Sequence, residues 1–234
     1  MGFNKISAPS LRGIFVRELE NMILSGELQV GEKLPSARDL AEQMGVSRTV
    51  VNAGLSELAG KGFLEVRPRV GVFVSDYRRN GTLSTLIAIM SYNGRMLRRN
   101  EVKAILEIRS ALECLILKLV VFKITSDELL TMEHLLDEIK ASQNSSQFAE
   151  CCFHFDHELC MISDNPLLPL YYGSFREPCC SLWQRYYQLY GKESLIQYNE
   201  QLLTLIRNKK LDEAMSLSES HLRETISGNK QLYF

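Results

Sequence analysis

Apolar residues near the start of the chain recur at the three- and four-residue spacing of an amphipathic helix. The first such run extends from Ser10 to Ser25, and Gly26 ends it. Its expected apolar face consists of Leu11, Ile14 or Phe15, Leu19, Met22 and Ile23. Because an amphipathic helix must bury this face, the pattern predicts that the helix packs against the segments that follow it.

The pattern from residue 35 to residue 62 predicts two short helices joined by a tight turn. Ser36 can cap the first helix, with Asp39 at its third residue. Gly45 supplies left-handed backbone for a reversal, and Ser47 can cap the second helix two residues later. Helices joined by so short a turn cross steeply, as they do in a helix-turn-helix.

The second of these helices has one apolar and one polar face. The expected buried stripe consists of Val51, Leu55 and Leu58. Arg48, Thr49 and Asn52 lie near the N-terminus on the polar side. Arginine can pair with guanine and asparagine with adenine, so this face can read the major groove of DNA. An ordinary helical hairpin with a solvated polar face is the alternative.

Two short strand-like runs follow, residues 63–67 and 70–74, with Gly71 beside the turn between them. A β-hairpin directly after such a helix pair predicts a winged helix-turn-helix. Arg67 and Arg69 are expected at the tip of the wing, where a rigid turn suits contact with phosphates or with the minor groove.

Beyond the polar segment 75–82, the pattern changes to long helical runs with little strand signal. The expected helices cover residues 83–91, 100–122, 127–142, 147–163, 166–190, 192–208 and 211–232. Helices without strands predict an all-α bundle. The fold class is therefore mainly α. We expect a winged helix-turn-helix domain at 8–76, a linker at 77–82, and an all-helical ligand-binding and dimerisation domain at 83–232.

Composition restricts the class of protein further. With 45% hydrophobic and 24% charged residues, the chain is typical of a globular protein. The net charge is -1, so any affinity for DNA must come from local clusters of arginine. No apolar run is long enough to span a bilayer and the N-terminus lacks signal-peptide features, so we expect a cytoplasmic protein without a membrane partner. Six cysteines form no C-x-x-C pair and are expected to stay reduced.

Three motifs between Gly31 and Val74 carry a resemblance to a known family. They read GEKLPSARDLAEQMGVSRTVV, LAGKGFLEV and PRVGVFV. This stretch resembles the DNA-binding domain of GntR-family bacterial transcriptional regulators. The resemblance implies DNA contacts from Arg38, Arg48, Thr49 and the wing around Arg69 and Gly71. Together with the positions argued from spacing, the predicted DNA-binding set is Arg38, Ser47, Arg48, Thr49, Asn52, Arg67, Arg69 and Gly71.

The recognition helix departs from the family pattern at two positions. The family usually has an arginine where this chain has Asn52, so the operator of a relative does not transfer directly. It commonly has alanine where this chain has Gly54. Glycine in a helix interior is expected to weaken the helix by about 1 kcal/mol relative to alanine.

The helical part resembles the FadR-like (FCD) branch of the family more loosely, from Asn100 to Ser227. Many members of that branch bind a divalent metal through an Asp and three His. Laying that pattern on this chain gives Cys152, Asp156, Asn199 and His221 at the four positions, so only His221 keeps the family's residue type. No cofactor is expected to be required, and zinc held by Cys152, Asp156 and His221 is the alternative.

Asp156 can be placed from helical spacing without the family. It lies one turn from Cys152, at the border of a core stripe. A carboxylate there needs a partner, because burying it unpaired would cost several kcal/mol. Arg109, His221 or a metal ion is expected to face it. The predicted ligand-binding set is Arg109, Cys152, Asp156, Tyr172, Arg185, Asn199 and His221.

The sequence therefore predicts a homodimeric, sequence-specific regulator of transcription that binds a double-stranded DNA operator. A small organic acid or acyl compound bound between the helices would modulate its affinity for DNA. Repression relieved by the ligand is what the resemblance implies. A metal-dependent helical-bundle enzyme and a ligand-free architectural DNA-binding protein are the alternatives, and no nucleophile with an oriented base supports the enzyme.

Overall fold

The computed structural model describes residues 10–92 and 99–232, apart from the side chains of Met90, Ser91 and Glu101. Residues 8 and 9, the expected start of the first domain, lie outside the described residues. Contacts divide the chain into two compact units, residues 1–94 and residues 95–234. The expected fold class is confirmed, because all regular secondary structure in the described part is helical apart from one two-stranded sheet.

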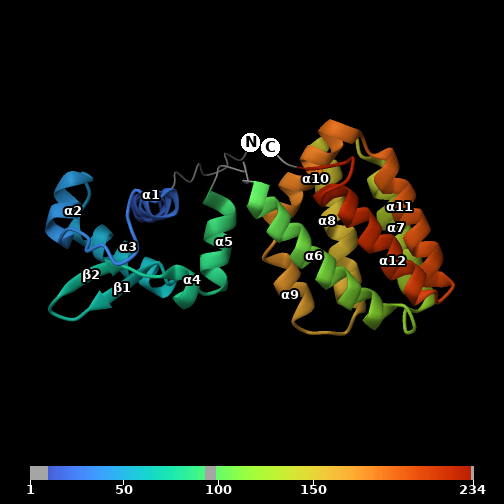
Figure 1. Ribbon diagram of the computed structural model, residues 1–234, viewed down its shortest axis with the longest axis horizontal. Helices are drawn as coiled ribbons and strands as arrows, with labels where there is room; N and C mark the ends of the chain where they lie inside the picture. The colour runs from blue at the N-terminus through green and yellow to red at the C-terminus, as the bar shows by residue number, and fades with distance from the viewer. Residues whose placement is uncertain (1–9, 93–98, 233–234) are drawn as a thin grey trace, which may run out of the picture. The chain divides into compact units, whose positions relative to one another are not determined.

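The first unit begins with three helices, α1 (Leu11–Ser25), α2 (Ala37–Gln43) and α3 (Arg48–Gly60) (Figure 1). Their core contains Phe15, Leu19 and Ile23 of α1, as helical spacing predicts. One expected position is wrong, because Leu11 is 59% exposed, and of the alternatives Ile14 and Phe15 it is Ile14 that is exposed, at 49%. Phe15 takes the inward position instead, because its ring packs over Gly54 of α3.

Gly54 lets α1 and α3 approach each other closely. A Cβ added to Gly54 would lie 2.3 Å from Phe15 Cδ1 and 3.4 Å from Val16 Cγ2. Close packing against α1 therefore offsets the weakening of α3 that is expected from a glycine in its interior. The Cα of Gly54 leaves space that the buried ring of Phe15 fills, and dense packing of that ring stabilises the pair of helices.

The wing is an antiparallel hairpin of β1 (Leu64–Arg67) and β2 (Gly71–Val74). Leu64 pairs with Val74 and Arg67 pairs with Gly71, so the turn spans residues 68–70. Lys33 forms an isolated bridge with Phe73 on the open side of β2. This third segment ties the wing to the start of the helix-turn-helix.

The expected linker and the expected first bundle helix differ from the structure. Residues Tyr77–Asn80 form a short helix, α4, and Leu83–Tyr92 form α5. Ala88 and Ile89 of α5 pack against the core of the first unit, and Thr85 donates a hydrogen bond to the carbonyl of Lys61. Because its apolar face finds partners there, α5 belongs to the first unit rather than to the bundle.

The second unit is an all-helical bundle, as expected. Its helices are α6 (Arg99–Val120), α7 (Ser126–Ala141), α8 (Ser145–Ile162), α9 (Leu168–Gly173), α10 (Arg176–Tyr190), α11 (Glu193–Arg207) and α12 (Leu211–Ile226) (Figure 1). The helix expected at 166–190 is divided by a turn at Ser174 and Phe175. The last helix ends at Ile226 rather than at 232. No helix among residues 10–92 and 99–232 combines the length and the hydropathy needed to cross a membrane.

Candidate functional site

The turn between α2 and α3 is built by three capping positions. Ser36 Oγ accepts a hydrogen bond from the backbone N–H of Asp39 at 3.3 Å, which starts α2. Gly45 has a φ of 64°, the left-handed conformation expected of it. Ser47 Oγ then accepts from the N–H of Val50 at 3.3 Å and starts α3. The predicted helix-turn-helix is therefore present.

α3 separates buried and exposed residues as its spacing predicts. Val51 and Leu58 are fully buried and Leu55 is 6% exposed. Ser47, Arg48, Thr49 and Asn52 are exposed along the first turns. Arg38 on α2 is exposed as well. The N-terminal end of α3 thus offers hydrogen-bonding side chains and a capped, electropositive helix terminus to the solvent.

The two arginines of the wing differ in their surroundings. Arg67 donates to both carboxylate oxygens of Glu65, at 3.1 and 2.8 Å, and its guanidinium lies 4.3 Å from the centre of the Phe73 ring. This pairing holds the pKa of the Glu65 carboxyl below its usual value. Arg69 sits in the turn with a φ of 65° and has no ion-pair partner among the described residues. Arg69 is therefore the uncompensated cation at the tip of the wing.

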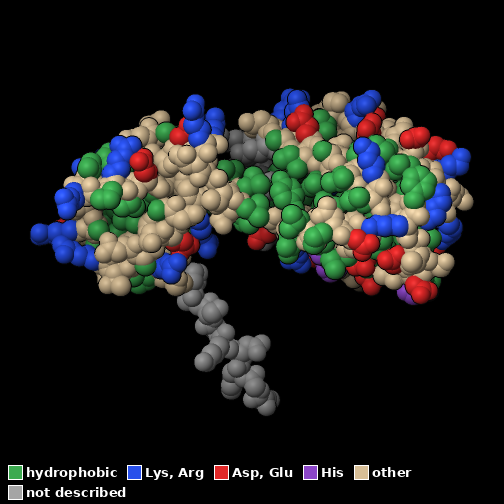
Figure 2. Space-filling model, turned by 90° about the horizontal axis from the view of Figure 1, so that it is seen from below, with side chains coloured by type: hydrophobic (Ala, Val, Ile, Leu, Met, Phe, Trp, Pro, Cys, Tyr) green, Lys and Arg blue, Asp and Glu red, His purple; other side chains and the backbone are tan. Residues whose placement is uncertain are grey.

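Basic side chains gather at the end of the first unit that carries α2 and the wing (Figure 2). Within the described part of the chain, Arg38, Arg48 and Arg69 are exposed and make no ion pair. Lys33, which sequence reasoning missed, is a fourth exposed cation whose stem packs over Gly71. In the sequence, the only sign of this role is that Lys33 comes shortly before α2. The structure places Lys33 opposite Phe73 of the wing strand β2. Together these groups form a positive surface suited to a polyanion.

The second unit holds a buried polar network centred on Arg109 of α6. Arg109 Nε donates to Glu113 Oε1 at 2.7 Å, and its NH2 group donates to Asp156 Oδ2 of α8 at 2.9 Å. The guanidinium also stacks on the Trp183 ring, 4.3 Å from the ring centre. The partner expected for the buried Asp156 carboxylate is thus Arg109.

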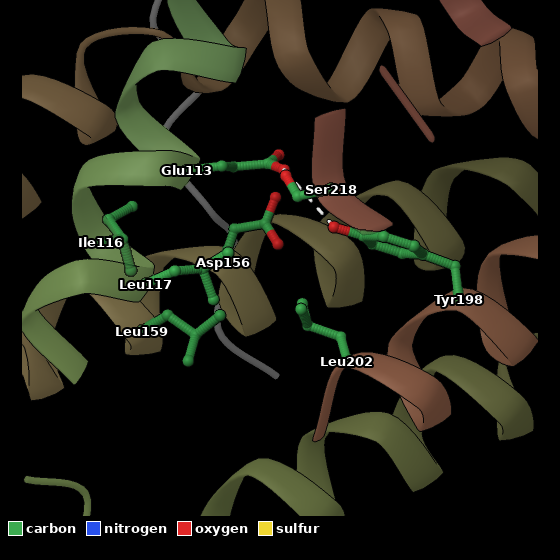
Figure 3. Close-up of a pocket in the computed structure, with 8 residues that line it drawn as sticks. All are labelled: Glu113, Ile116, Leu117, Asp156, Leu159, Tyr198, Leu202 and Ser218. Atoms are coloured by element: carbon green, nitrogen blue, oxygen red, sulfur yellow. Dashed lines mark hydrogen bonds between the residues drawn. The ribbon is translucent and has the colours of Figure 1, made fainter. Parts of the chain in front are cut away.

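Hydroxyl groups complete the network. Tyr172 donates to Asp156 Oδ2 at 2.7 Å, and Ser218 donates to Glu113 Oε2 at 2.7 Å. Tyr198 also donates to Glu113 Oε2, at a distance of 3.4 Å (Figure 3). Burial raises the pKa of Asp156 to about 6, although Arg109 acts in the opposite direction.

Of the predicted ligand-binding residues, Arg109, Asp156 and Tyr172 belong to this network. The other four lie outside it. Cys152 is buried one turn before Asp156, where burial raises the pKa of its thiol well above the usual value. His221 stacks on Tyr198 with ring centres 4.0 Å apart, and burial lowers the pKa of the imidazole to about 3. Asn199 is buried next in sequence to Tyr198. Arg185 lies on α10 and is not part of the wall of the nearby cavity.

A cavity next to the network is lined by eight residues from four helices. They are Glu113, Ile116 and Leu117 of α6, Asp156 and Leu159 of α8, Tyr198 and Leu202 of α11, and Ser218 of α12 (Figure 3). Of the seven predicted ligand-binding residues only Asp156 lines it. Sequence reasoning missed Glu113 as a site residue, although its four-residue spacing from Arg109 is the signal of an ion pair on one helix face.

The residues present do not fit the metal site implied by the FCD resemblance. In the ranges 10–92 and 99–232, no three His, Cys, Asp or Glu side chains come together as a metal-binding group. Asp156 instead faces a guanidinium, whose positive charge opposes a divalent ion at the same carboxylate. The zinc site of Cys152, Asp156 and His221 is therefore not assembled.

Comparison with known proteins assigns both units. Residues 15–74 match the family described as bacterial regulatory proteins, gntR family, and residues 104–224 match the FCD domain. The second match alone covers more than half of the 234 residues. The chain belongs to the FCD-containing gntR family of bacterial regulators. The two matched ranges each fall within one of the two compact units of this gntR-family protein.

Its relatives in Bacillus subtilis strain 168 include two HTH-type transcriptional regulators. LutR is 31% identical over 148 residues, which is 63% of this chain and 65% of LutR. YcbG is 25% identical over 202 residues, 86% of this chain and 78% of YcbG. The chain therefore spans somewhat less than two thirds of LutR in that match.

A solved structure of Lar, described as controlling expression of the agr system of Listeria monocytogenes, shares the fold. The superposition has a TM-score of 0.63 and covers 95% of this chain and 97% of that one, at 14% sequence identity. At that identity the likeness concerns the arrangement of helices and strands alone.

Proposed function

We propose that this gntR-family protein is a sequence-specific DNA-binding regulator of transcription and not an enzyme. The first unit would place α3 in the major groove, with the wing on the adjoining backbone or minor groove. As a protein that acts on bacterial chromosomal DNA, it would work in the cytoplasm. Repression that a bound ligand relieves is the mode of action that we propose.

The observation that carries this proposal is the exposure of Arg48 at the capped N-terminus of α3. Its side chain is exposed at the first residue of α3, directly after a serine cap, and makes no ion pair within the described part of the chain. The opposite face of the same helix is buried through Val51 and Leu58. An arginine held in this way can make the bidentate contact that guanine offers.

We propose that the regulator acts as a homodimer. α6 exposes Ile108 and Leu115, which are 37% and 40% accessible and seven residues apart, and Phe122, which is 65% accessible, follows seven residues later in the turn after the helix. Seven-residue spacing of apolar residues along one helix face is typical of helices that pair. A two-fold dimer would match an operator with two-fold symmetry. Sedimentation analysis tests this, because Leu115→Glu should give a monomer if this face pairs, and an unchanged dimer would contradict that surface.

The second unit would bind the effector, in line with the FCD match. A ligand that fits one arrangement of the bundle better than another shifts the population toward it, and DNA affinity changes by the same coupling free energy. The buried network around Arg109 and the adjoining cavity are the place where a ligand would exert this difference.

The direct test compares Arg48→Ala with Arg223→Ala. Both changes remove one exposed positive charge, but Arg223 lies on α12 of the second unit. Gel shift with the selected operator should show a loss of at least about fivefold for Arg48→Ala, since a bidentate base contact contributes roughly 1–3 kcal/mol. Arg223→Ala should bind as the parent does. Equal affinities for all three proteins would refute the proposal.

A further inference from the structure

The turn at the tip of the wing holds an arginine where the backbone favours glycine. The N–H of Val70 donates to the carbonyl of Arg67 at 3.0 Å, which closes a turn with Pro68 and Arg69 at its centre. Arg69 has a φ of 65°. A positive φ at the third residue of such a turn normally selects glycine or asparagine. Arg69 therefore adopts a conformation that costs free energy for a residue with a Cβ.

The other residues with this backbone conformation have a local explanation. Among the described non-glycine residues, only Arg69, Asp164 and Lys209 have a positive φ. Asp164 directly follows the C-cap of α8, and Lys209 directly follows the C-cap of α11. Left-handed backbone at that position is a common way to end a helix. Arg69 ends no helix, and strained residues without a local role are found where proteins bind their partners.

The surroundings of Arg69 leave its side chain available to a partner. It is exposed and makes no ion pair within the described part of the chain, whereas Arg67 is held by Glu65 and the Phe73 ring. Val70 is 55% exposed and is not among the residues with positive φ. A cation that only contacted phosphates could stand at position 70 without strain. The centre of the turn differs from position 70 in being the outermost point of the hairpin.

We propose that Arg69 enters the minor groove of the operator and selects A·T base pairs there. This assignment rests on the proposed function, because it names the feature of DNA that the wing recognises. Runs of A·T pairs narrow the minor groove and strengthen its negative potential, which attracts arginine. The edge of an A·T pair in this groove has acceptors alone, and a G·C pair adds the amino donor of guanine. A guanidinium has donors and no acceptor, so it pairs with the first edge and is opposed by the second.

The experiment compares three versions of the operator that the full-length protein selects from random duplexes. Selection should enrich A·T pairs in the minor groove next to each half-site that α3 contacts. These pairs are then kept, replaced by G·C, or replaced by inosine·cytosine. Inosine lacks the 2-amino group of guanine, so an inosine·cytosine pair has the minor-groove edge of A·T and the major-groove edge of G·C.

Gel shifts with the three duplexes distinguish the two grooves. We expect the G·C version to bind at least about fivefold more weakly than the A·T version, as for a mismatched base pair. The inosine·cytosine version should bind as the A·T version does. Equal binding of all three duplexes overturns the proposal. An inosine·cytosine duplex that binds as weakly as the G·C duplex also overturns it, because the preference would then be read in the major groove.

Two glycine variants assign the preference to Arg69. Arg69→Gly removes the guanidinium and should lose the preference for A·T, while melting no lower than the parent because glycine adopts a positive φ without strain. Lys209→Gly removes a cation from a position with a φ of 59° in the second unit and should keep the preference. A preference that survives in Arg69→Gly overturns the proposal. So does a markedly lower melting temperature of Arg69→Gly, since the side chain would then serve the fold.

This outcome is separate from the test of the proposed function. A selected operator without A·T enrichment beside its half-sites removes the role of Arg69 and leaves the DNA-binding regulator. Selection that enriches no sequence removes both.

Discussion

Arg109 of α6 reaches across the bundle, and its NH2 group donates a hydrogen bond to Asp156 Oδ2 of α8 at a distance of 2.9 Å. The side chains of both residues are nearly buried, at 10% and 15% exposure. Sequence spacing places Asp156 at the edge of a core and requires a partner for it. The structure supplies that partner from a residue 47 positions away, and it shows Glu113 competing for the same guanidinium.

Removing the guanidinium should destabilise the helical unit strongly. Arg109→Met keeps much of the side-chain volume beside Trp183 but leaves Glu113 and Asp156 buried without their cation. We expect a loss of about 3–5 kcal/mol in the free energy of unfolding. Urea denaturation measures it, with Arg223→Met as the control. A loss below about 1 kcal/mol would show that the pair is solvated.

The stability of the protein should also depend on the protonation of Asp156. Its folded-state pKa is about 6, above the usual 3.8, because burial disfavours the carboxylate. Between these two pH values the native state binds more protons than the unfolded state. The contribution of Asp156 to stability is therefore fully present below about pH 3.8 and is lost as pH rises through about 6.

Unfolding free energies of the parent and of Asp156→Asn across pH 4 to 7.5 isolate this effect. The parent should lose stability relative to the variant as pH rises through the window, and the difference should be flat above it. A parent that gains on the variant over the same range would mean that the pKa of Asp156 is lowered.

Two glycines of α3 should respond in opposite ways to alanine. At Gly54 a Cβ would lie 2.3 Å from the Phe15 ring, whereas at Gly60 it would meet nothing within 4 Å. Gly60→Ala should stabilise the first unit by up to about 1 kcal/mol through helix propensity. Gly54→Ala should destabilise it by about 1–3 kcal/mol because the added methyl overpacks the core. Thermal melts of both variants decide this, and stabilisation by Gly54→Ala would contradict the close packing.

The two wing arginines should contribute unequally to DNA binding. Arg69 is uncompensated at the tip, while the charge of Arg67 is already met by Glu65. Arg69→Ala should weaken operator binding and reduce its salt dependence by about one released counterion. Arg67→Ala should do so by a smaller amount, because Glu65 and the Phe73 ring already hold the Arg67 guanidinium. Gel shifts over a range of salt concentrations compare the two, and a larger effect at Arg67 would reverse this assignment.

Local rules account for the parts of the structure that were predictable. Ser36, Gly45 and Ser47 each act through neighbours within three residues, so their spacing alone predicts the helix-turn-helix. The position of α5 was not predictable in this way, because its apolar face could have packed on either unit. The close approach of Phe15 and Gly54 likewise depends on residues far apart in the sequence.

The polar network of the bundle lies between these cases. The need of Asp156 for a partner follows from burial, and Arg109 is one of the candidates that the sequence offers. Which hydroxyls complete the network depends on the relative rotation of five helices, as the contacts of Tyr172 with Asp156 and of Tyr198 and Ser218 with Glu113 show. The sequence therefore predicts the centre of the network and not its outline.

Selection of binding sites from random duplexes, with the parent protein and with Asn52→Arg, tests the central claim most directly. Asn52 is exposed on the same face of α3 as Arg48. We expect the parent to enrich a two-fold symmetric sequence and Asn52→Arg to shift one position in each half-site toward guanine. Enrichment of no sequence by the parent, or of an identical sequence by both proteins, would contradict the placement of α3 in the major groove.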